Sequence, residues 1–411
     1  MSALSGRHVV LGVCGGIAAY KAIDVCRRLV DAGAHVVPVL THGALRFVGE
    51  TTFSALASEA VQSSLWNETN PIPHTRLGQA ADLILIAPAT ARLLSDYRTG
   101  RSADLLTATL LATRAPVLVC PAMHTEMWEH PAVQENLAVL AARGVHIVNP
   151  DAGRLAGGDV GTGRLASAEA IVAHAERLLS AGDLRGLRML VTAGGTREAI
   201  DPVRVVTNRS TGKQGYAVAA AAWARGAEVT LVTSADRPAP VGVEIIAVES
   251  AADMQAAVMP RAGSFDVIVM AAAVADFRPK VIAEHKIKKG DGLSEIVLEP
   301  THDFLVDLGR AKRPGQIIVG FAAETHDLAT NAKDKLTRKH LDIIVANDVT
   351  APAVGFGHDT NAVTIFTVEG DASAIPLADK RVIADAICDA IVIRRDRDST
   401  TRTVIPQGRN L

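Results

Sequence analysis

The stretch HVVLGVCGGIAAYKAIDVCRRLV, residues 8–30, decides the fold of the first half of the chain. A continuous apolar run leads into a pair of glycines, and the residues after them have helical spacing. Continuous apolar runs are typical of parallel strands that helices cover on both faces. Strands are therefore predicted at 8–13, 35–40, 83–89, 116–123 and 145–150, and helices at 17–32, 125–143 and 167–180. This alternation predicts an α/β domain with a doubly wound parallel sheet.

The second half repeats this arrangement with a different sequence. After a polar, glycine-containing segment at 180–188, the run RMLVTAGG (188–195) again leads from a strand into glycines. Further strands are predicted at 228–234, 243–249, 266–274, 317–324, 342–348 and 362–368, and a last helix at 377–395. We therefore expect two doubly wound, Rossmann-like domains, 1–182 and 183–395, and a flexible tail at 396–411.

The composition limits the classes of function. The 411 residues are 48% apolar and 21% charged, and they carry a formal net charge of −2. This balance gives no electrostatic reason to expect nucleic acid or an anionic membrane as a partner. No window approaches the ~20 apolar residues of a spanning helix, and no signal peptide is visible. The four cysteines form no CxxC pair, so we expect a globular protein of the reducing cytoplasm.

Each predicted domain opens with glycines after its first strand. Such turns expose backbone N–H groups at a helix N-terminus, where phosphate binds. The first turn is not a GxGxxG fingerprint, because positions 14 and 17 are Cys and Ile. STGKQ (210–214) is not a Walker loop either, because Thr207 stands at the first glycine position and Gln214 follows the lysine. For both turns, a phosphate site and a tight turn without a ligand remain open alternatives.

Other polar residues near strand ends have two interpretations each. His74 is the natural proton carrier if it lines a cleft, but a lone loop histidine is more often a surface residue. PAMHTEMWEH (121–130) fits a site or simple core packing. The lysines of 285–289 and 333–339 fit a polyphosphate site or a solvated face. The stretch LAGGDVGTGRLA (155–166) has so many glycines that we expect a loop that bends or moves.

These motifs, in this order, resemble the CoaBC (Dfp) family of bifunctional coenzyme A biosynthesis flavoproteins over about residues 6–395. The residues that carry the resemblance are GGIAAYK (15–21), His74, APAT (87–90), PAM-xxx-MW (121–128), GD-x-G-x-GR (158–164), TAGGTRE-x-IDPVR (192–204), N-x-S-x-GK (208–213), AAAVADF (271–277), KIKK (286–289), GFAAET (320–325) and AND (346–348). The resemblance implies phosphopantothenoylcysteine decarboxylase and phosphopantothenate–cysteine ligase activities in one chain.

For the first domain, the resemblance implies a flavodoxin-like cysteine decarboxylase that binds FMN. The flavin would oxidise the substrate thiol, which eases loss of the carboxylate, and then return a hydride. His74 matches the active-site histidine, and the expected FMN contacts are Gly15, Gly16, Thr41, Ala87, Pro88, Ala89 and Thr90.

The first domain departs from the family pattern at two positions. His124 replaces the usual Asn after PAM, and Gly157 replaces the flap cysteine that supplies a proton. A histidine can still hydrogen-bond the substrate carboxylate, so we keep His124 among the catalytic candidates. The group that delivers the last proton is left open.

For the second domain, the resemblance implies a CTP-dependent ligase. The carboxylate of 4′-phosphopantothenate would attack CTP to give an acyl-cytidylate, from which the amine of L-cysteine displaces CMP. Lys286 would act in the first step, Asn208 in the second, and Arg204 would bind an anionic group. Asp276 is expected to bind Mg²⁺. The expected CTP contacts are Met270, Ala271, Ala272, Asp276, Lys286, His302, Asp303, Phe304, Leu305, Phe321, Lys335 and Lys339, although THDF (301–304) departs from the family's Asn-Pro-Asp run.

Three functions are thus compared. The favoured one is cysteine ligation followed by decarboxylation to 4′-phosphopantetheine. The others are an active ligase with an impaired or scaffolding FMN domain, and a non-catalytic flavin-binding regulatory subunit. The resemblance also implies a homo-oligomer, with trimers of FMN domains and dimers of ligase domains that could close into a dodecamer.

Overall fold

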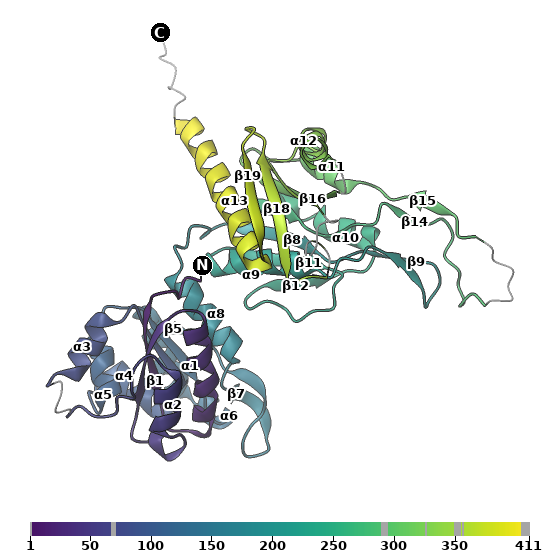
Figure 1. The fold of residues 1–411 in the computed structure, drawn as a ribbon. Helices are drawn as coiled ribbons and strands as arrows, with labels where there is room; N and C mark the ends of the chain where they lie inside the picture. Colours follow the sequence, from purple (N-terminus) through teal and green to yellow (C-terminus); the bar gives the residue numbers. More distant parts are fainter. Residues whose placement is uncertain are drawn as a thin grey trace, which may run out of the picture. The chain divides into compact units, whose positions relative to one another are not determined.

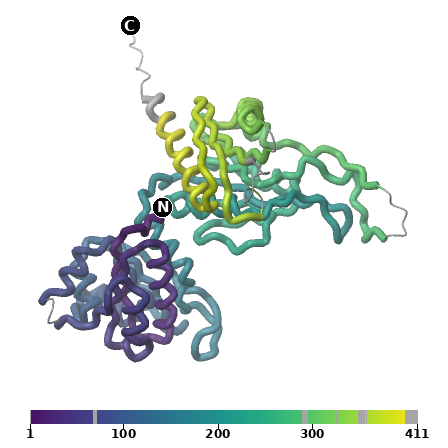
Figure 2. Tube along the Cα trace, in the orientation of Figure 1, coloured from purple at the N-terminus to yellow at the C-terminus, as the bar shows by residue number. Residues whose placement is uncertain are grey.

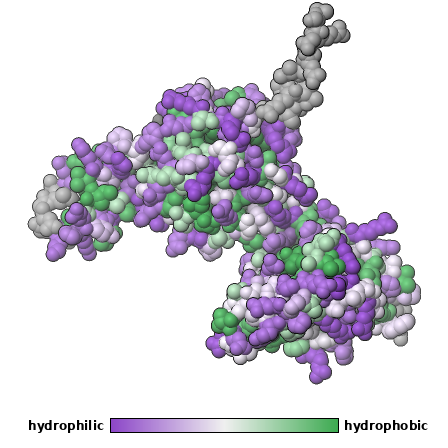
Figure 3. Space-filling model, turned by 180° about the vertical axis from the view of Figure 1, so that it is seen from behind, coloured by the Kyte–Doolittle hydropathy of each residue, from purple (hydrophilic) through white to green (hydrophobic). Residues whose placement is uncertain are grey.

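The computed structural model describes residues 2–66, 71–288, 295–324, 327–348, 355 and 357–403. Contacts within the chain form two compact units, Met1–Ala181 and Gly182–Leu411. Figure 2 follows the chain from the N-terminal unit, in purple and blue, into the C-terminal unit, in teal to yellow. On the face shown in Figure 3, polar side chains prevail and apolar patches lie between them.

The N-terminal unit is a doubly wound, flavodoxin-like sheet, as predicted. Its strands pair in parallel in the order β2-β1-β3-β4-β5. The strands after β2 are added on the other side of β1, so the topological switch point lies between β1 and β3. The strands are β1 (His8–Val13), β2 (His35–Leu40), β3 (Leu83–Ala89), β4 (Val117–Pro121) and β5 (His146–Ile147). The helices are η1 (Ile17–Lys21), α1 (Ala22–Asp31), η2 (Ala44–Arg46), α2 (Glu50–Leu56), α3 (Pro73–Ala80), α4 (Ala91–Thr99), α5 (Leu105–Leu111), α6 (Thr125–Glu129), α7 (Pro131–Ala142) and α8 (Ala168–Leu179).

Helices cover both faces of this sheet (Figure 1). Along β1, Val9 and Leu11 pack against α1, α2 and α8, whereas Val10 packs against the opposite layer of α3, α4, α5 and α7. Successive strand residues point to opposite faces, so two hydrophobic layers require a strand that is apolar throughout. This explains why the continuous runs predicted the sheet correctly.

An antiparallel hairpin extends from this unit after β5. Its strands are β6 (Asp151–Arg154) and β7 (Val160–Arg164), and we call the hairpin with its turn, residues 155–159, the flap. The flap packs on the segment after β4: a Cβ on Gly163 would lie 2.1 Å from the carbonyl oxygen of Met123. Glycine at 163 therefore allows an approach that no larger residue permits.

The C-terminal unit has an eight-stranded sheet in the order β12-β11-β8-β13-β16-β17-β18-β19. Its strands are β8 (Arg188–Ala193), β11 (Glu228–Thr233), β12 (Glu244–Ala247), β13 (Val267–Met270), β16 (Ile317–Glu324), β17 (Ile343–Asp348), β18 (Thr360–Thr367) and β19 (Ala372–Asp379). The pairs from β12 to β17 are parallel, and the last two pairs are antiparallel. The helices are α9 (Lys213–Ala224), α10 (Ala251–Val258), η3 (Ala262–Ser264), α11 (Phe304–Arg310), α12 (Leu328–Arg338) and α13 (Lys380–Thr403).

Two short antiparallel pairs project from the sheet of the C-terminal unit (Figure 1). They are β9 (Arg197–Ala199) with β10 (Val205–Thr207), and β14 (Phe277–Pro279) with β15 (Leu298–Pro300). Of the predicted site residues, Arg204 lies between β9 and β10, and Lys286 lies between β14 and β15.

Several predicted elements need correction. The helix expected at 125–143 is divided into α6 and α7 because Pro131 has no N–H to continue the first helix. The segment before the last helix is strand β19, whose exposed, proline-containing sequence has no clear alternation, as is tolerated at a sheet edge.

The last helix also differs from its predicted end at 395. It continues to Thr403, and so includes residues that we assigned to the tail. Ion pairs stabilise this polar part of the helix, for example the 2.7 Å contact between Arg397 and Asp371. A pattern of apolar residues does not indicate such pairs. Residues 404–411 of the expected tail lie outside the described residues. Among the helices that the structure describes, none is both long and apolar enough to cross a membrane.

Candidate active sites

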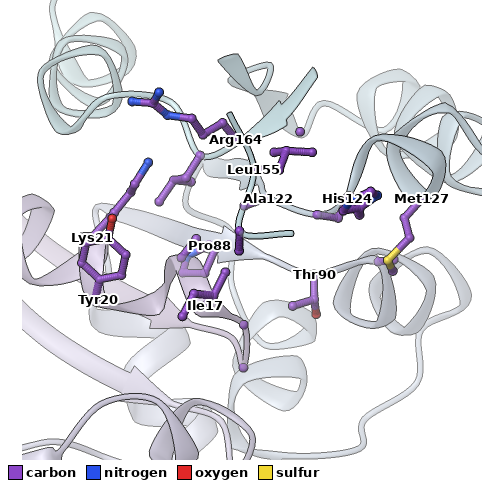
Figure 4. A pocket seen from close by; sticks show the side chains of 18 of the residues that line it. Ile17, Tyr20, Lys21, Pro88, Thr90, Ala122, His124, Met127, Leu155 and Arg164 are labelled. Atoms are coloured by element: carbon purple, nitrogen blue, oxygen red, sulfur yellow. The ribbon is translucent and has the colours of Figure 1, made fainter. Parts of the chain in front are cut away.

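The N-terminal unit contains a cavity of about 720 Å³ between the carboxyl ends of its strands and the flap. The turn after β1 forms one wall, the segments after β3 and β4 another, and the flap a third (Figure 4). A Cβ on Gly15 would lie 2.5 Å from the backbone of Gly43, so these two loops touch as only glycine allows. This is the crevice where ligands of open α/β sheets bind.

The charge of this cavity is one-sided. Lys21, Arg154, His124 and Arg164 line it, and none of its described lining residues is a carboxylate. Figure 4 shows Lys21 and Arg164 at one end and His124 with Met127 at the other. Burial, and next the positive charge of Arg164, lower the pKa of the Lys21 ammonium. A negatively charged ligand would relieve that repulsion.

Only some of the residues predicted to contact FMN line this cavity. Gly15, Gly16, Pro88 and Thr90 line the cavity, whereas Ala87 and Ala89 are fully buried in β3. Thr41 also lies outside it: its hydroxyl donates to the carbonyl of Val13 (3.3 Å) and accepts from the N–H of Ala44 (3.2 Å). Lys21 and Arg164 are the last residues of the GGIAAYK and GD-x-G-x-GR motifs, but neither was predicted to bind FMN, and Arg154 lies outside the motifs.

His124 connects the segment after β4 to the flap. Its Nδ1 pairs with Glu126, and its Nε2 lies 3.1 Å from Oδ2 of Asp159 in the flap turn. The hydrogen bonds to Glu126 and then Asp159 raise the pKa of the imidazole. A Cβ on Gly157 would lie 3.6 Å from the same Nε2. Position 157, where relatives were expected to have cysteine, is thus next to His124.

His74 is not among the residues that line this cavity. It stands in the first turn of α3, after Pro73, and its Nδ1 is buried without a hydrogen-bond partner in the described part of the chain. In Figure 1, α3 and β7 lie on opposite sides of the N-terminal unit. One copy of the unit does not bring His74 and the flap together.

The C-terminal unit has a smaller pocket, about 120 Å³, at the carboxyl ends of β13, β16 and β17. Ala271, Ala272 and Phe321, three of the predicted CTP contacts, line it. Its other lining residues were not predicted as contacts: Ser210, Thr211, Gly212, Lys213, Gln214, Gly215, Ala273, Ala323, Asn347, Gly355, Asn361 and Lys380. Ser210, Gly212 and Lys213 belong to the NxSxGK motif that carries the resemblance, and the overlapping STGKQ (210–214) was compared with a Walker loop and did not match it.

The remaining predicted CTP contacts lie outside this pocket. Met270 and Phe304 are buried in the hydrophobic core, and Leu305 packs against it. His302 pairs with Asp307 (2.5 Å), Asp303 with Lys339 (2.8 Å) and Lys335 with Glu324 (2.6 Å). Asp276 and Lys286 are exposed. Among the residues that the structure describes, no group of three His, Cys, Asp or Glu side chains could hold a metal ion.

Asn208 contacts a segment that lines this pocket, and Arg204 contacts the residue after Lys286. The amide Nδ2 of Asn208 donates to the carbonyls of Ala273 and Val274, both at 3.2 Å. Arg204 lies 2.7 Å from Oδ2 of Asp201 and donates to the carbonyl of Ile287. The Asn208 side chain is therefore held against the segment that follows β13. The Arg204 guanidinium is instead paired with a carboxylate of its own loop.

Known protein families match almost the whole chain. Residues 184–394 match the family described as DNA/pantothenate metabolism flavoprotein C-terminal domain, and residues 2–180 match the Flavoprotein family. The coenzyme A biosynthesis bifunctional protein CoaBC of Mycobacterium bovis is 48% identical over 94% of this chain and 96% of its own length. CoaBC of Bacillus subtilis is 46% identical over 94% of this chain and 97% of its own length. A solved C-terminal domain of CoaBC is 40% identical, with a TM-score of 0.46, and covers 53% of this chain and 100% of that one.

Proposed function

The chain belongs to the CoaBC family of bifunctional coenzyme A biosynthesis proteins, and on this premise we propose how its two units divide the work. The protein is a bifunctional enzyme with a ligase and a decarboxylase activity. We propose that residues 183–395 join L-cysteine to 4′-phosphopantothenate with CTP and Mg²⁺, through an acyl-cytidylate. Residues 1–182 would then decarboxylate the product to 4′-phosphopantetheine with FMN.

One observation carries the decarboxylase assignment: the cavity under the flap has cations and no carboxylate among its described lining residues. Both FMN and the substrate carry a phosphate, which Lys21 and Arg164 suit as charge-assisted hydrogen-bond donors. Gly15, Gly16, Pro88 and Thr90 would hold the flavin. Bound there, FMN supplies an acceptor for the electrons of the substrate thiol, which eases loss of the carboxylate.

We infer that His124 is the acid on the flap side of this cavity. Its pKa is raised by carboxylate partners, so the imidazolium persists closer to neutral pH. Each of the four cysteines is buried, and burial raises the pKa of the thiol of Cys14 to about 12 and that of Cys26 to about 11. With Gly157 on the flap, His124 is the group beside that position with a proton to give.

We propose that His74 acts as the base of a neighbouring copy's cavity. It does not line the cavity of its own unit, and α3 lies across the sheet from the flap (Figure 1). A homo-oligomer would resolve this separation, because one copy then supplies α3 and the other supplies the flap. Trimers of N-terminal units and dimers of C-terminal units, closing into a dodecamer, remain the proposed assembly, and the cytoplasm the proposed location.

In the C-terminal unit, we propose that CTP enters the pocket beside Ala271, Ala272 and Phe321. Asp276 alone offers too few oxygens for Mg²⁺, so the ion would be completed by triphosphate oxygens and water. For Lys335 and Lys339 to contact CTP, their ion pairs with Glu324 and Asp303 must open. Lys286 is exposed and would act in acyl-cytidylate formation, with Asn208 in its aminolysis.

The test supplies 4′-phosphopantothenate, CTP, Mg²⁺ and L-cysteine to the purified protein, and follows pyrophosphate, CMP, CO₂ and 4′-phosphopantetheine. We expect all four products in equal amounts, and none when CTP is omitted. Pyrophosphate and CMP without CO₂ would leave only the ligase and make the N-terminal unit a scaffold. Absence of every product, with flavin bound, would favour a regulatory flavoprotein.

A further inference from the structure

The pocket of the C-terminal unit has two lysines that the proposed ligase has not used. Lys213 is the first residue of α9 and Lys380 is the first residue of α13, and both line the pocket. The helices follow β10 and β19, at distant points of the chain. A cation at a helix N-terminus is opposed by the helix dipole, so helix stability alone does not account for either lysine.

Lys380 is buried, with 7% of its surface exposed. Its Nζ donates to the carbonyl of Gly355 (3.1 Å) and to that of His358. Its own carbonyl accepts from the Gln214 amide at 3.1 Å, which ties it to α9. Burial, and next the charge of Lys213, lower the pKa of the Lys380 ammonium. The two lysines therefore repel each other across a small space.

Lys213 is partly neutralised by one exposed carboxylate. Its Nζ donates to the carbonyl of Gly357 (2.9 Å) and to Oδ1 of Asp359 (2.7 Å), a side chain that is 83% exposed. An ammonium has three N–H donors. The contacts described for Lys213 and Lys380 use two on each, so each keeps a donor within the part of the chain that the structure describes.

The size of the pocket points to part of a ligand rather than a whole one. Its 120 Å³ is below the ~300–1,000 Å³ of sites for drug-sized molecules. Beside the lysines, Ser210 offers a hydroxyl, and Ala271 and Ala272 let a ligand come close. The combination suits a compact anion with many acceptor oxygens.

We propose that Lys213 and Lys380 form a polyphosphate subsite that holds the terminal phosphates of the nucleoside triphosphate. This rests on the proposed ligase function and names cations for it other than Lys335 and Lys339, which are engaged by Glu324 and Asp303. The subsite would orient the leaving pyrophosphate and would not touch the nucleoside.

The test measures binding of inorganic tripolyphosphate to the full-length protein by calorimetry, with Mg²⁺ present. Lys213→Gln and Lys380→Met should each weaken binding about tenfold or more, because each removes a charge-assisted hydrogen bond. Arg310→Gln removes an exposed cation at the end of α11 and should leave binding unchanged. If Lys380→Met does not fold, Lys213→Gln alone decides. Unchanged affinity in a folded Lys213→Gln protein would overturn the proposal.

A second measurement separates the terminal phosphates from the rest of the nucleotide. In the same variants, KM for CTP should rise about tenfold while the Kd for CMP stays unchanged, because CMP lacks the terminal phosphates. Equal weakening of CTP and CMP would contradict the subsite. Failure of the ligase itself looks different: the wild-type protein would then bind neither CTP nor tripolyphosphate.

Discussion

The imidazole Nε2 of His124 lies 3.1 Å from the carboxylate Oδ2 of Asp159, and this contact joins the segment after β4 to the turn of the flap. Glu126 holds the opposite ring nitrogen. His124 thus holds the flap over the cavity and also lines the cavity with a group that can donate a proton. The two roles, latch and acid, make different predictions.

For the role as acid, His124→Gln should uncouple the products of the N-terminal unit. CO₂ should still form, while 4′-phosphopantetheine falls about 10²–10⁴-fold, the usual range for general acid catalysis. The measurement is the ratio of 4′-phosphopantetheine to CO₂ by mass spectrometry. Adding Gly157→Cys to this variant should restore part of the product, since a side chain at 157 points to the same place. An unchanged ratio in His124→Gln would exclude His124 as the donor.

For the role as latch, the flap should open as the pH rises. The pKa of His124 is raised in the folded protein, so the pairing is fully present below the unfolded pKa of ~6.5 and is lost as pH rises through the folded value. Limited proteolysis of residues 155–159 should therefore become faster on the alkaline side. Asp159→Asn should reduce this pH dependence, and a rate independent of pH in the wild type would refute the latch.

His74→Asn should abolish CO₂ release and leave CMP formation intact, because α3 belongs to the N-terminal unit alone. If His74 serves a neighbouring copy, mixed oligomers give a sharper result. His74→Asn and His124→Gln proteins, each deficient in 4′-phosphopantetheine formation, should regain part of that yield when mixed and reassembled, through sites with both residues intact. No recovery in demonstrated hetero-oligomers would place both residues in one copy's site.

Much of this arrangement could be predicted from the sequence, and the reasons are local. The runs at 8–13 and 83–89 contain no polar residue except His8 at the first position, because helices cover both faces of the sheet, so their strands were found with the correct bounds. Strand β19 was missed because it is exposed at the sheet edge and contains Pro376. The end of α13 was missed because long-range ion pairs stabilise it.

The sites were harder to predict than the sheets. Gly15 and Thr90 could be placed because their motifs adjoin strand ends. Lys380 could not, since it stands more than 160 residues from Gln214 and meets it through the sheet order alone. Lys335 lies in α12 and Lys339 directly follows it, but their partner carboxylates come from other elements.

Asn208→Asp should separate the two steps of the ligase. The Asn208 amide donates to two carbonyls, and a carboxylate would instead repel them. We expect pyrophosphate to form while the cysteine adduct falls at least about tenfold, the effect of losing a well-placed hydrogen bond to a buried or reacting group. Rapid-quench analysis would detect the accumulated acyl-cytidylate. Unchanged turnover would remove Asn208 from the aminolysis step.

Asp201 should position Lys286 without touching CTP. Its carboxylate accepts from the N–H of Ile287 at 3.2 Å, and Arg204 binds the carbonyl of the same residue, so both backbone groups beside Lys286 are fixed. Burial opposes ionisation of Asp201, but the backbone N–H donors and Arg204 outweigh it and lower its pKa.

Asp201→Asn should weaken this grip and lower kcat/KM for CTP about tenfold to a hundredfold, since small displacements of a catalytic group have effects of this size. Acetylation of Lys286, followed by mass spectrometry, should become faster in the variant. Asp334→Asn, an exposed change in α12, serves as the control and should alter neither measurement. Slower ligation with unchanged labelling of Lys286 would mean that Asp201 acts through Arg204, which it also contacts, rather than through Ile287.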